Sequence, residues 1–352
     1  MKKSTLAVPL ALIRISMKFS NNYIFYPDSQ PLERAIAHYN SLLDDPAAEA
    51  DCAPDTKAAV QDNFTHTRGN YEHLRYSNNI LVTARETLEA KLAETAREQN
   101  PLDWAELQNN LGNILAAIGQ QMRDDDMFEK AIAAFKHALE EYNQEQLPLD
   151  WAVTQYNLGT AEQALGRQLN DSKLLKSSID AYTNSLLEWS REQQPLEWAS
   201  TMFQLGATFH AHGKLLKGNR TFQKSVVAYK NSLKELDADN AALELVATHN
   251  NRGAVLQHLG ESEENSERLE EALRAYETGL LVCQEQQLPI HLAAMCKVNI
   301  ATTRCVLAEL TKDSAVAQET ADDFELIIEL FHNALQPLCL KHCEEQFLKA
   351  QS

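Results

Sequence analysis

The sequence has little positive charge, and this shortage restricts its partners. Lys and Arg number 32 against 50 Asp and Glu among 352 residues, which gives a net charge of −18. Sequence-independent binding to a nucleic-acid backbone or to anionic lipid needs an excess of Lys and Arg. We therefore expect neither nucleic acid nor a membrane surface as a partner.

Residues that interrupt helices are also scarce. Only 11 Gly and 10 Pro occur, and no segment of any length has the composition of a β-strand. Long stretches are instead rich in Ala, Leu, Glu and Gln, which favour helix. The composition predicts a folded, all-α protein.

Motifs that carry chemistry are missing. The sequence contains no Gly-rich phosphate loop, no nucleophile elbow and no paired His and carboxylate motif, so we expect no enzyme. Five of the six cysteines lie in the last quarter, mostly at apolar helical positions, unlike a secreted disulfide framework. Cys339, His342 and Cys343 offer three metal ligands at most, and we interpret them as part of a packed helix. No metal or other cofactor is expected.

Residues 1–30 are open to several interpretations. Met1-Lys2-Lys3 and the apolar run from Leu6 to Ile13 resemble a short signal peptide. Basic residues follow the run, no small-residue cleavage site is evident, and the run is too short to span a bilayer. The segment is alternatively a buried first helix, or it precedes a true start at Met17. We expect a cytoplasmic protein, with secretion as the alternative.

A motif repeated at a fixed spacing organises the rest of the chain. Pro101-Leu102-Asp103-Trp104-Ala105 returns as Pro148-Leu149-Asp150-Trp151-Ala152 and as Pro195-Leu196-Glu197-Trp198-Ala199, in steps of 47 residues (148−101 and 195−148). The register continues, without Trp, at residues 242 and 289. Such a period is typical of solenoids, in which stacked units form one elongated body. We expect a repeat domain over residues 31–336, strongest over 101–288, and a capping helix over 337–352.

Each 47-residue unit is predicted to be a helical hairpin. Its first helix contains Asn-Leu-Gly or a close variant, and a second Gly follows seven residues later, at 119, 166, 213 and 260. We expect this second Gly to end the helix with a positive φ and a polar loop to follow it.

The second helix of each unit begins after that loop. Its N-caps are predicted at Asp125, Ser172, Asn219 and Ser266. Small and aromatic residues then alternate at helical spacing, as in Phe128, Ala131, Phe135 and Ala138. This face is predicted to pack against the first helix.

These residues resemble the signature of the tetratricopeptide repeat family. The family places Leu-Gly and a turn Gly in its first helix and a small, an aromatic and a small residue in its second; the first unit has Leu111-Gly112, Gly119, Ala131, Phe135 and Ala138. The period is 47 residues against the family's 34. The chain therefore resembles a long-loop, bacterial-type variant, with about seven extra residues between the helices of a unit. The resemblance implies a right-handed superhelical solenoid whose first helices line a concave surface.

The resemblance also nominates binding residues on that surface. In the family, the Asn before Leu-Gly holds an extended peptide backbone, and an amide offers a donor and an acceptor together. The candidates are Asn109, Asn110, Asn113, Tyr156, Asn157, Thr160, Gln163, Phe203, Gln204, His210, Asn250, Asn251 and Gln257. The alternative is that the Asn residues only satisfy hydrogen bonds within and between helices.

The candidate face has almost no positive charge. No Lys or Arg occurs in residues 105–119, 152–166 or 199–213, and Arg252 is the only one in 246–260. Family members that capture acidic tails need inward Lys and Arg. We therefore expect a protein-interaction scaffold or adaptor that binds a neutral or basic segment, extended or helical. The alternative is a regulatory sensor that binds a small peptide or metabolite in the same groove, and the repeated Trp is interpreted as a packing wedge.

Overall fold

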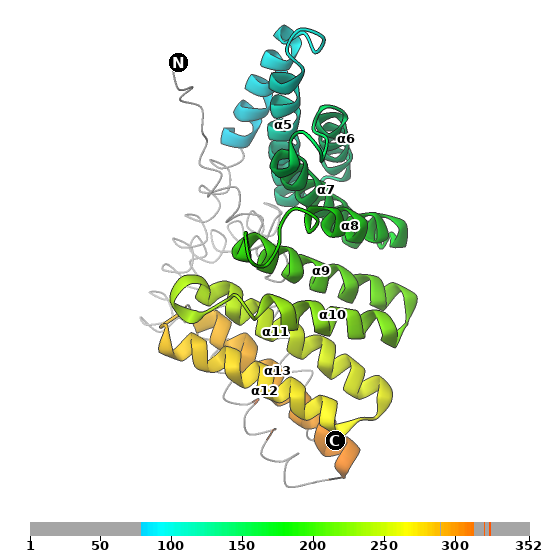
Figure 1. The fold of residues 1–352 in the computed structure, drawn as a ribbon. Coiled ribbons are helices and arrows are strands. Elements are labelled where there is room, and N and C mark those ends of the chain that lie inside the picture. Colours follow the sequence, from blue (N-terminus) through cyan, green and yellow to red (C-terminus); the bar gives the residue numbers. More distant parts are fainter. Residues whose placement is uncertain (1–78, 289, 313–319, 321–323, 325–352) are drawn as a thin grey trace, which may run out of the picture. The chain divides into compact units, whose positions relative to one another are not determined.

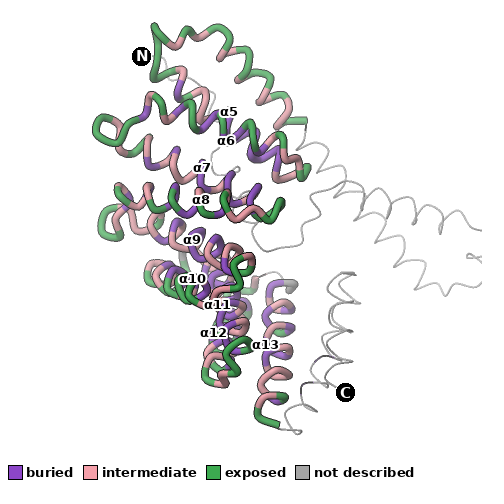
Figure 2. Tube along the Cα trace, turned by 90° about the vertical axis from the view of Figure 1, so that its right-hand side faces the viewer, coloured by how far each residue is buried: buried purple, intermediate pink, exposed green. Residues whose placement is uncertain are grey.

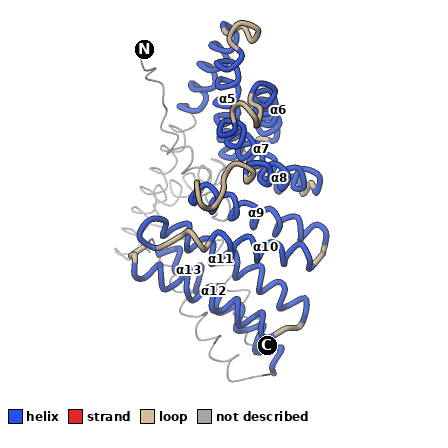
Figure 3. Tube along the Cα trace, in the orientation of Figure 1, coloured by secondary structure: helices blue, strands red, loops and turns tan. Residues whose placement is uncertain are grey.

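The computed structural model describes residues 79–288, 290–312, 320 and 324 (Figure 1). Every regular element in this part of the chain is a helix (Figure 3), which confirms the all-α prediction there. After a helix over residues 79–94 come α5 (Pro101–Met122), α6 (Asp125–Glu141), α7 (Pro148–Leu169), α8 (Ser172–Ser185), α9 (Pro195–Leu216), α10 (Asn219–Ser232), α11 (Ala238–Glu263), α12 (Ser266–Glu285) and α13 (Ile290–Thr311). None of the described helices combines the length and apolarity that crossing a bilayer requires. The predictions for residues 1–30 and 337–352, including the cysteines of the last segment, lie outside the described residues.

The chain divides into two compact units, residues 1–181 and 182–352, which are described separately. In the first unit, α5 packs against α6 and α7, and α6 packs against α7. In the second, each helix from α9 to α13 packs against the next, and α11 also contacts α9 and α13. Figure 2 shows buried residues along the helices and exposed residues both at the connections and along parts of the helices. Both units are arrays of sequential antiparallel hairpins, as the repeat predicts.

The first helices of the hairpins begin where the repeated Pro predicts. α5, α7 and α9 start at Pro101, Pro148 and Pro195, and each is 22 residues long. Pro suits this position because the N–H that it lacks has no partner in a first turn. α11 has no such Pro, and it starts early at Ala238 with a kink at Ala241 (φ −150°).

The connection within a hairpin is a short turn and not a long loop. Only two residues separate Met122, the end of α5, from Asp125, the start of α6. The long loop predicted between the helices is therefore wrong, and the first helix continues past Gly119 instead. The Gly119 carbonyl accepts hydrogen bonds from the N–H groups of Arg123 and Asp124, which closes the helix end.

The residue with positive φ in each turn is not Gly. It recurs every 47 residues, at Arg123, Asn170, Lys217 and Glu264, with φ between 49° and 54°. No Gly among the described residues has a positive φ. The predicted role of the second Gly was therefore wrong, and packing gives the physical reason for Gly there. A Cβ on Gly119 would lie 3.0 Å from Phe128, and one on Gly260 would lie 2.7 Å from Leu269.

The N-caps lie one residue before the predicted positions. Asp124 accepts hydrogen bonds from the N–H groups of Asp126 and Met127, and Asn265 accepts one from Arg268. Asp171 caps α8 in the same way. The predicted residues are already helical because the positive-φ residue ends the first helix two positions earlier.

The predicted face of the second helices forms the core of the hairpins. All its members are buried: Phe128, Ala131, Phe135, Ala138, Leu175, Ser178, Tyr182, Ser185, Phe222, Ser225, Tyr229, Ser232, Leu269, Ala272, Tyr276 and Gly279. Ser takes the place of the small apolar residue at some of these positions. The buried hydroxyls of Ser178 and Ser225 are satisfied because they donate to the carbonyls of Gly159 and Gly206. The repeat pattern therefore located the hydrophobic core correctly.

One of the repeated Trp residues, Trp151, packs against the preceding hairpin, as the wedge interpretation expects. Trp151 lies against Ala105, Ala138 and Tyr142, which belong to the preceding hairpin. Trp104 instead lies under the Arg97 guanidinium, 4.5 Å from the ring centroid to Cζ. Arg97 also forms ion pairs with Glu140 and Glu141 at the end of α6.

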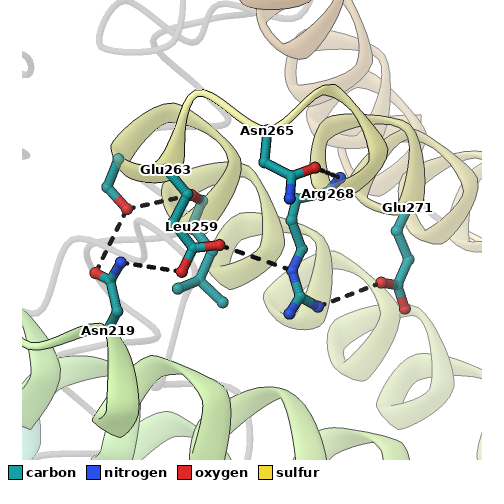
Figure 4. A network of polar contacts seen from close by, with 7 residues as sticks. Asn219, Leu259, Glu263, Asn265, Arg268 and Glu271 are labelled. Carbon is teal, nitrogen blue, oxygen red and sulfur yellow. Dashed lines mark hydrogen bonds and ion pairs between the residues drawn. The ribbon is translucent and has the colours of Figure 1, made fainter.

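Polar contacts join the turns of neighbouring hairpins in the second unit (Figure 4). Asn219 donates to Glu263 (3.0 Å), which extends from the end of α11. Glu263 lies 4.0 Å from Arg268, which also pairs with Glu271 (3.7 Å). These contacts connect the start of α10 with the α11–α12 turn.

Candidate functional site

In the first unit, an amide bridge joins neighbouring first helices. Nδ2 of Asn157 on α7 donates to Oδ1 of Asn109 on α5 at 3.2 Å. Both side chains are partly exposed, as are Asn110, Tyr156 and Thr160. The Thr160 hydroxyl donates to the Tyr156 carbonyl one turn earlier. The structure thus brings five predicted site residues onto adjacent helices.

The second unit contains an equivalent bridge. Nδ2 of Asn299 on α13 donates to Oδ1 of Asn250 on α11 at 2.7 Å. The bridged residues are 49 apart here and 48 apart in the first unit, because Asn299 lies one residue past position 298, which 47-residue steps from Asn157 reach. Asn299 was not among the predicted site residues.

Several predicted site residues are buried. Asn113, Gln163, Gln204, Asn250 and Asn251 all have side chains enclosed by packing. They lie on the side of the first helices that meets other helices. Their amides therefore fit the alternative interpretation, hydrogen bonding within and between hairpins, better than direct contact with a partner.

The aromatic candidates contact the second helix of their own hairpin. Phe203 packs edge-on against Tyr229 with centroids 5.7 Å apart, and His210 packs similarly against Phe222 at 5.9 Å. Both side chains remain partly exposed. They extend the apolar core toward the surface of α9.

Gln257 is held by three hydrogen bonds. Its Oε1 accepts from the Tyr276 hydroxyl (3.2 Å) and from Thr303 (3.0 Å), and its Nε2 donates to Glu261 (2.8 Å). The contact with Thr303 joins α11 to α13. Gln257 on α11 therefore connects this helix with α12 and α13.

The single Arg of the candidate segments is neutralised within its hairpin. Arg252 pairs with Glu271 on α12. Its side chain is mostly buried. In the first unit, residues 105–119 and 152–166, which include the partly exposed Asn109 and Asn157, contain no Lys or Arg.

Glu162 is a buried carboxylate that was not predicted from the sequence. Glu162 on α7 is 1% exposed; its Oε1 accepts from Ser177 at 2.8 Å and lies 3.8 Å from Lys136 Nζ. Its Oε2 has no hydrogen-bond partner among the described residues. Burial raises the pKa of Glu162 above its ordinary value, against smaller opposing effects of Ser177 and Lys136. Comparison of the repeats would have revealed it, because Leu115 and Leu256 occupy the same register.

His249 on α11 makes stability depend on pH. Burial, reinforced by Arg252, lowers the pKa of His249 from 6.5 to about 4. The unfolded chain therefore binds a proton between these values that the folded protein does not, so stability rises with pH across this window. Gln occupies the equivalent position in two earlier repeats, at Gln108 and Gln155. His249→Gln should remove about 2 kcal/mol of this rise in the free energy of unfolding, after allowance for the partial exposure of His249.

Urea unfolding measured at several pH values checks this prediction. The matched control is His137→Gln on α6, where the imidazole is exposed. The free energies of unfolding of wild type and His249→Gln should differ more at the acid end of the window than at its neutral end. Parallel pH profiles for the two proteins would contradict the assignment.

Within the described residues, no group of three or more His, Cys, Asp or Glu side chains is arranged to hold a metal ion. Cys283 and Cys296 are buried free thiols on α12 and α13. No protein-family model matches the chain, and no curated protein matches its sequence at a significant level. The function is therefore inferred from the hairpin array and the amide bridges.

Proposed function

We propose that this protein is an interaction scaffold that binds a segment of another protein along the first helices of its hairpins. In this proposal the hairpins are of tetratricopeptide type and form a right-handed superhelix with these helices on its concave side. The amide bridge between Asn109 and Asn157 is the observation that supports the proposal most directly.

The bridge leaves both amides with unused hydrogen-bonding capacity. Among the described residues it occupies an acceptor of Asn109 and a donor of Asn157, and neither Nδ2 of Asn109 nor Oδ1 of Asn157 has another partner. A peptide unit needs one donor and one acceptor together. Because the bridge fixes the two side chains, a bound backbone would lose little additional side-chain entropy.

The surroundings of the bridge favour a neutral or basic segment. Asn110, Tyr156 and Thr160 lie on the same pair of helices and are partly exposed. No Lys or Arg from these helix segments is available to neutralise an acidic tail. The net charge of −18 acts in the same direction.

Replacing Asn109 and Asn157 with Ala tests the proposal. The probe is a phage-displayed library of random dodecapeptides, selected on the full chain and then synthesised. The double variant should bind the selected peptides at least about tenfold more weakly, because it loses two hydrogen bonds to the peptide. Fluorescence anisotropy measures the affinity, and far-UV circular dichroism should be unchanged.

The matched control is the pair Gln99→Ala and Asn100→Ala, in the connection before α5. Both side chains are exposed, and Asn100 makes no capping hydrogen bond. This control should bind the peptides as wild type does. Equal affinity for wild type and for a folded Asn109/Asn157 variant would refute binding at the bridge.

A further inference from the structure

A second surface of the first unit combines exposed leucines with carboxylates. Leu102 and Leu149 follow the Pro at the start of α5 and α7 and are 49% and 55% exposed. Asp103, Glu106 and Asp150 are exposed on the same helix starts. We call these five residues, with the Tyr142 hydroxyl, the helix-start patch.

One apolar cluster connects the three helices at the helix-start patch. Ala105 of α5, Tyr142 at the end of α6 and Trp151 of α7 pack together there. Single exposed leucines are ordinary on protein surfaces. Here two occupy equivalent positions on helices that contact each other.

Tyr142 brings an unused hydrogen-bond donor into the patch. The residue is 7% exposed, and its hydroxyl makes no hydrogen bond among the described residues. Burial, followed by the nearby carboxylates of Asp150, Glu106 and Asp103, raises the pKa of Tyr142 to about 12. The hydroxyl is thus neutral and lies close enough to all three carboxylates to interact with their charges.

The carboxylates of the patch are not balanced by bases of the same unit. Among the described residues, Asp103, Glu106 and Asp150 form no ion pair within 4.0 Å. The neighbouring base Arg97 is engaged by Glu140, Glu141 and the Trp104 ring. The patch therefore keeps its negative charge.

This combination occurs where the α5–α6 hairpin meets the start of α7, and it is not a consequence of the repeat. The Leu and the acid after Pro recur, but Glu106 becomes Val153 and Ser200 in the next two units. Tyr142 becomes Trp189 and then Leu236. A role in stacking alone would not distinguish the first strong unit from the others.

We propose that the helix-start patch binds a segment of another protein in which Lys or Arg alternates with aliphatic side chains. The aliphatic side chains cover Leu102 and Leu149, while the cations meet the three carboxylates. The Tyr142 hydroxyl donates to a backbone carbonyl of the segment. The leucines of the patch and the amides of the bridge are different residues with their own variants, so the failure of one proposal is distinguishable from the failure of the other.

Three synthetic dodecapeptides test the proposal against the full chain by fluorescence anisotropy. They alternate Lys with Leu, Lys with Ser, and Glu with Leu. The Lys–Leu peptide should bind, with affinity falling as salt increases, whereas the other two should bind at least about tenfold more weakly. Equal binding of the Lys–Ser peptide would overturn the apolar part of the proposal.

Matched variants locate the binding. Leu102→Ser with Leu149→Ser should weaken the Lys–Leu peptide about tenfold for each Leu removed. Met122→Ser with Leu169→Ser, at the opposite ends of the same two helices and 54% and 48% exposed, should leave it unchanged. Equal losses in both pairs would show unspecific adhesion and overturn the proposal.

Charge is tested separately. Glu106→Gln with Asp150→Asn should weaken binding and reduce its salt dependence, whereas Glu86→Gln with Glu129→Gln, which removes two exposed acids elsewhere, should do neither. If the Lys–Leu peptide binds only after residues 1–20 are deleted, the basic start of this same chain fills the patch. That result would overturn assignment to another protein.

Discussion

Gly206→Ala is expected to lower the free energy of unfolding by about 3 kcal/mol, at the upper end of overpacking effects. A Cβ at this position would lie 2.7 Å from both Cδ1 and Cε1 of Tyr229. The Tyr229 ring is 1% exposed and has Phe203 packed on it, so it cannot move aside without displacing a neighbour. Gly253 faces Tyr276 and Gly112 faces Phe135 in the same way.

Urea unfolding followed by circular dichroism measures this effect. Gly218→Ala provides the control, because the nearest atom to its new Cβ is 4.0 Å away. Gly218 is an N-cap with no side-chain hydrogen bond, so the control should cost less than about 1 kcal/mol. Similar losses at the two positions would contradict a packing role for Gly206.

A double variant separates the clash from the intrinsic effect of Ala in a helix. Tyr229→Leu removes the ring that the new methyl group meets. Gly206→Ala should therefore cost much less in the Tyr229→Leu background than in wild type. Additive losses would mean that the two residues do not oppose each other.

The repeat period predicted the hairpins because identical packing requirements recur at identical spacing. Pro101, Pro148 and Pro195 marked helix starts correctly, since Pro restricts the backbone by itself. Phe135, Tyr229 and Tyr276 marked the core, because a large buried ring needs a partner without a side chain. These features depend on local chemistry or on pairs within one unit.

The turn was mispredicted because two functions of Gly look alike in a sequence. Gly119 could supply a positive φ or a close approach, and only the packed structure shows the second. Arg123 adopts the positive φ, although nothing in its side chain favours that conformation. The three-dimensional constraint outweighs the local preference at that residue.

The candidate site was predicted only in part because burial depends on the neighbouring hairpin. Asn110 and Asn157 remain partly exposed, whereas Gln204 and Asn251, in equivalent positions of other units, are buried. The same register position therefore has different exposure in different units. Sequence spacing assigns a helix face, but packing against neighbouring helices decides how much of that face is covered.

Glu162→Leu is expected to stabilise the protein by about 2–3 kcal/mol at neutral pH, within the range found when buried ion pairs are replaced by apolar residues. Leu115 and Leu256 show that the repeat accepts Leu at this register with the side chain buried. The substitution removes a carboxylate whose Oε2 lacks a partner among the described residues. The Ser177 hydroxyl, which loses its acceptor, is only partly buried and can bind water.

The gain should depend on pH with a defined sign. Because burial raises the pKa of Glu162, the folded protein keeps its proton at pH values where the unfolded chain has lost it. Wild-type stability therefore falls as pH rises from the ordinary carboxyl pKa through the raised one, and this loss is complete above the raised value. Glu162→Leu should thus gain little at about pH 4 and its full increment at about pH 8.

Glu162→Gln separates charge from shape. The amide keeps an oxygen that can accept from Ser177 but carries no charge, so this variant should show the same pH dependence with a smaller gain. Glu129→Gln on the exposed surface of α6 should change neither stability nor its pH profile. A loss of stability in Glu162→Leu at every pH would mean that Ser177 and Lys136 more than compensate for the burial of the carboxylate. The acid would then stabilise the packing of α7 against α6 and α8.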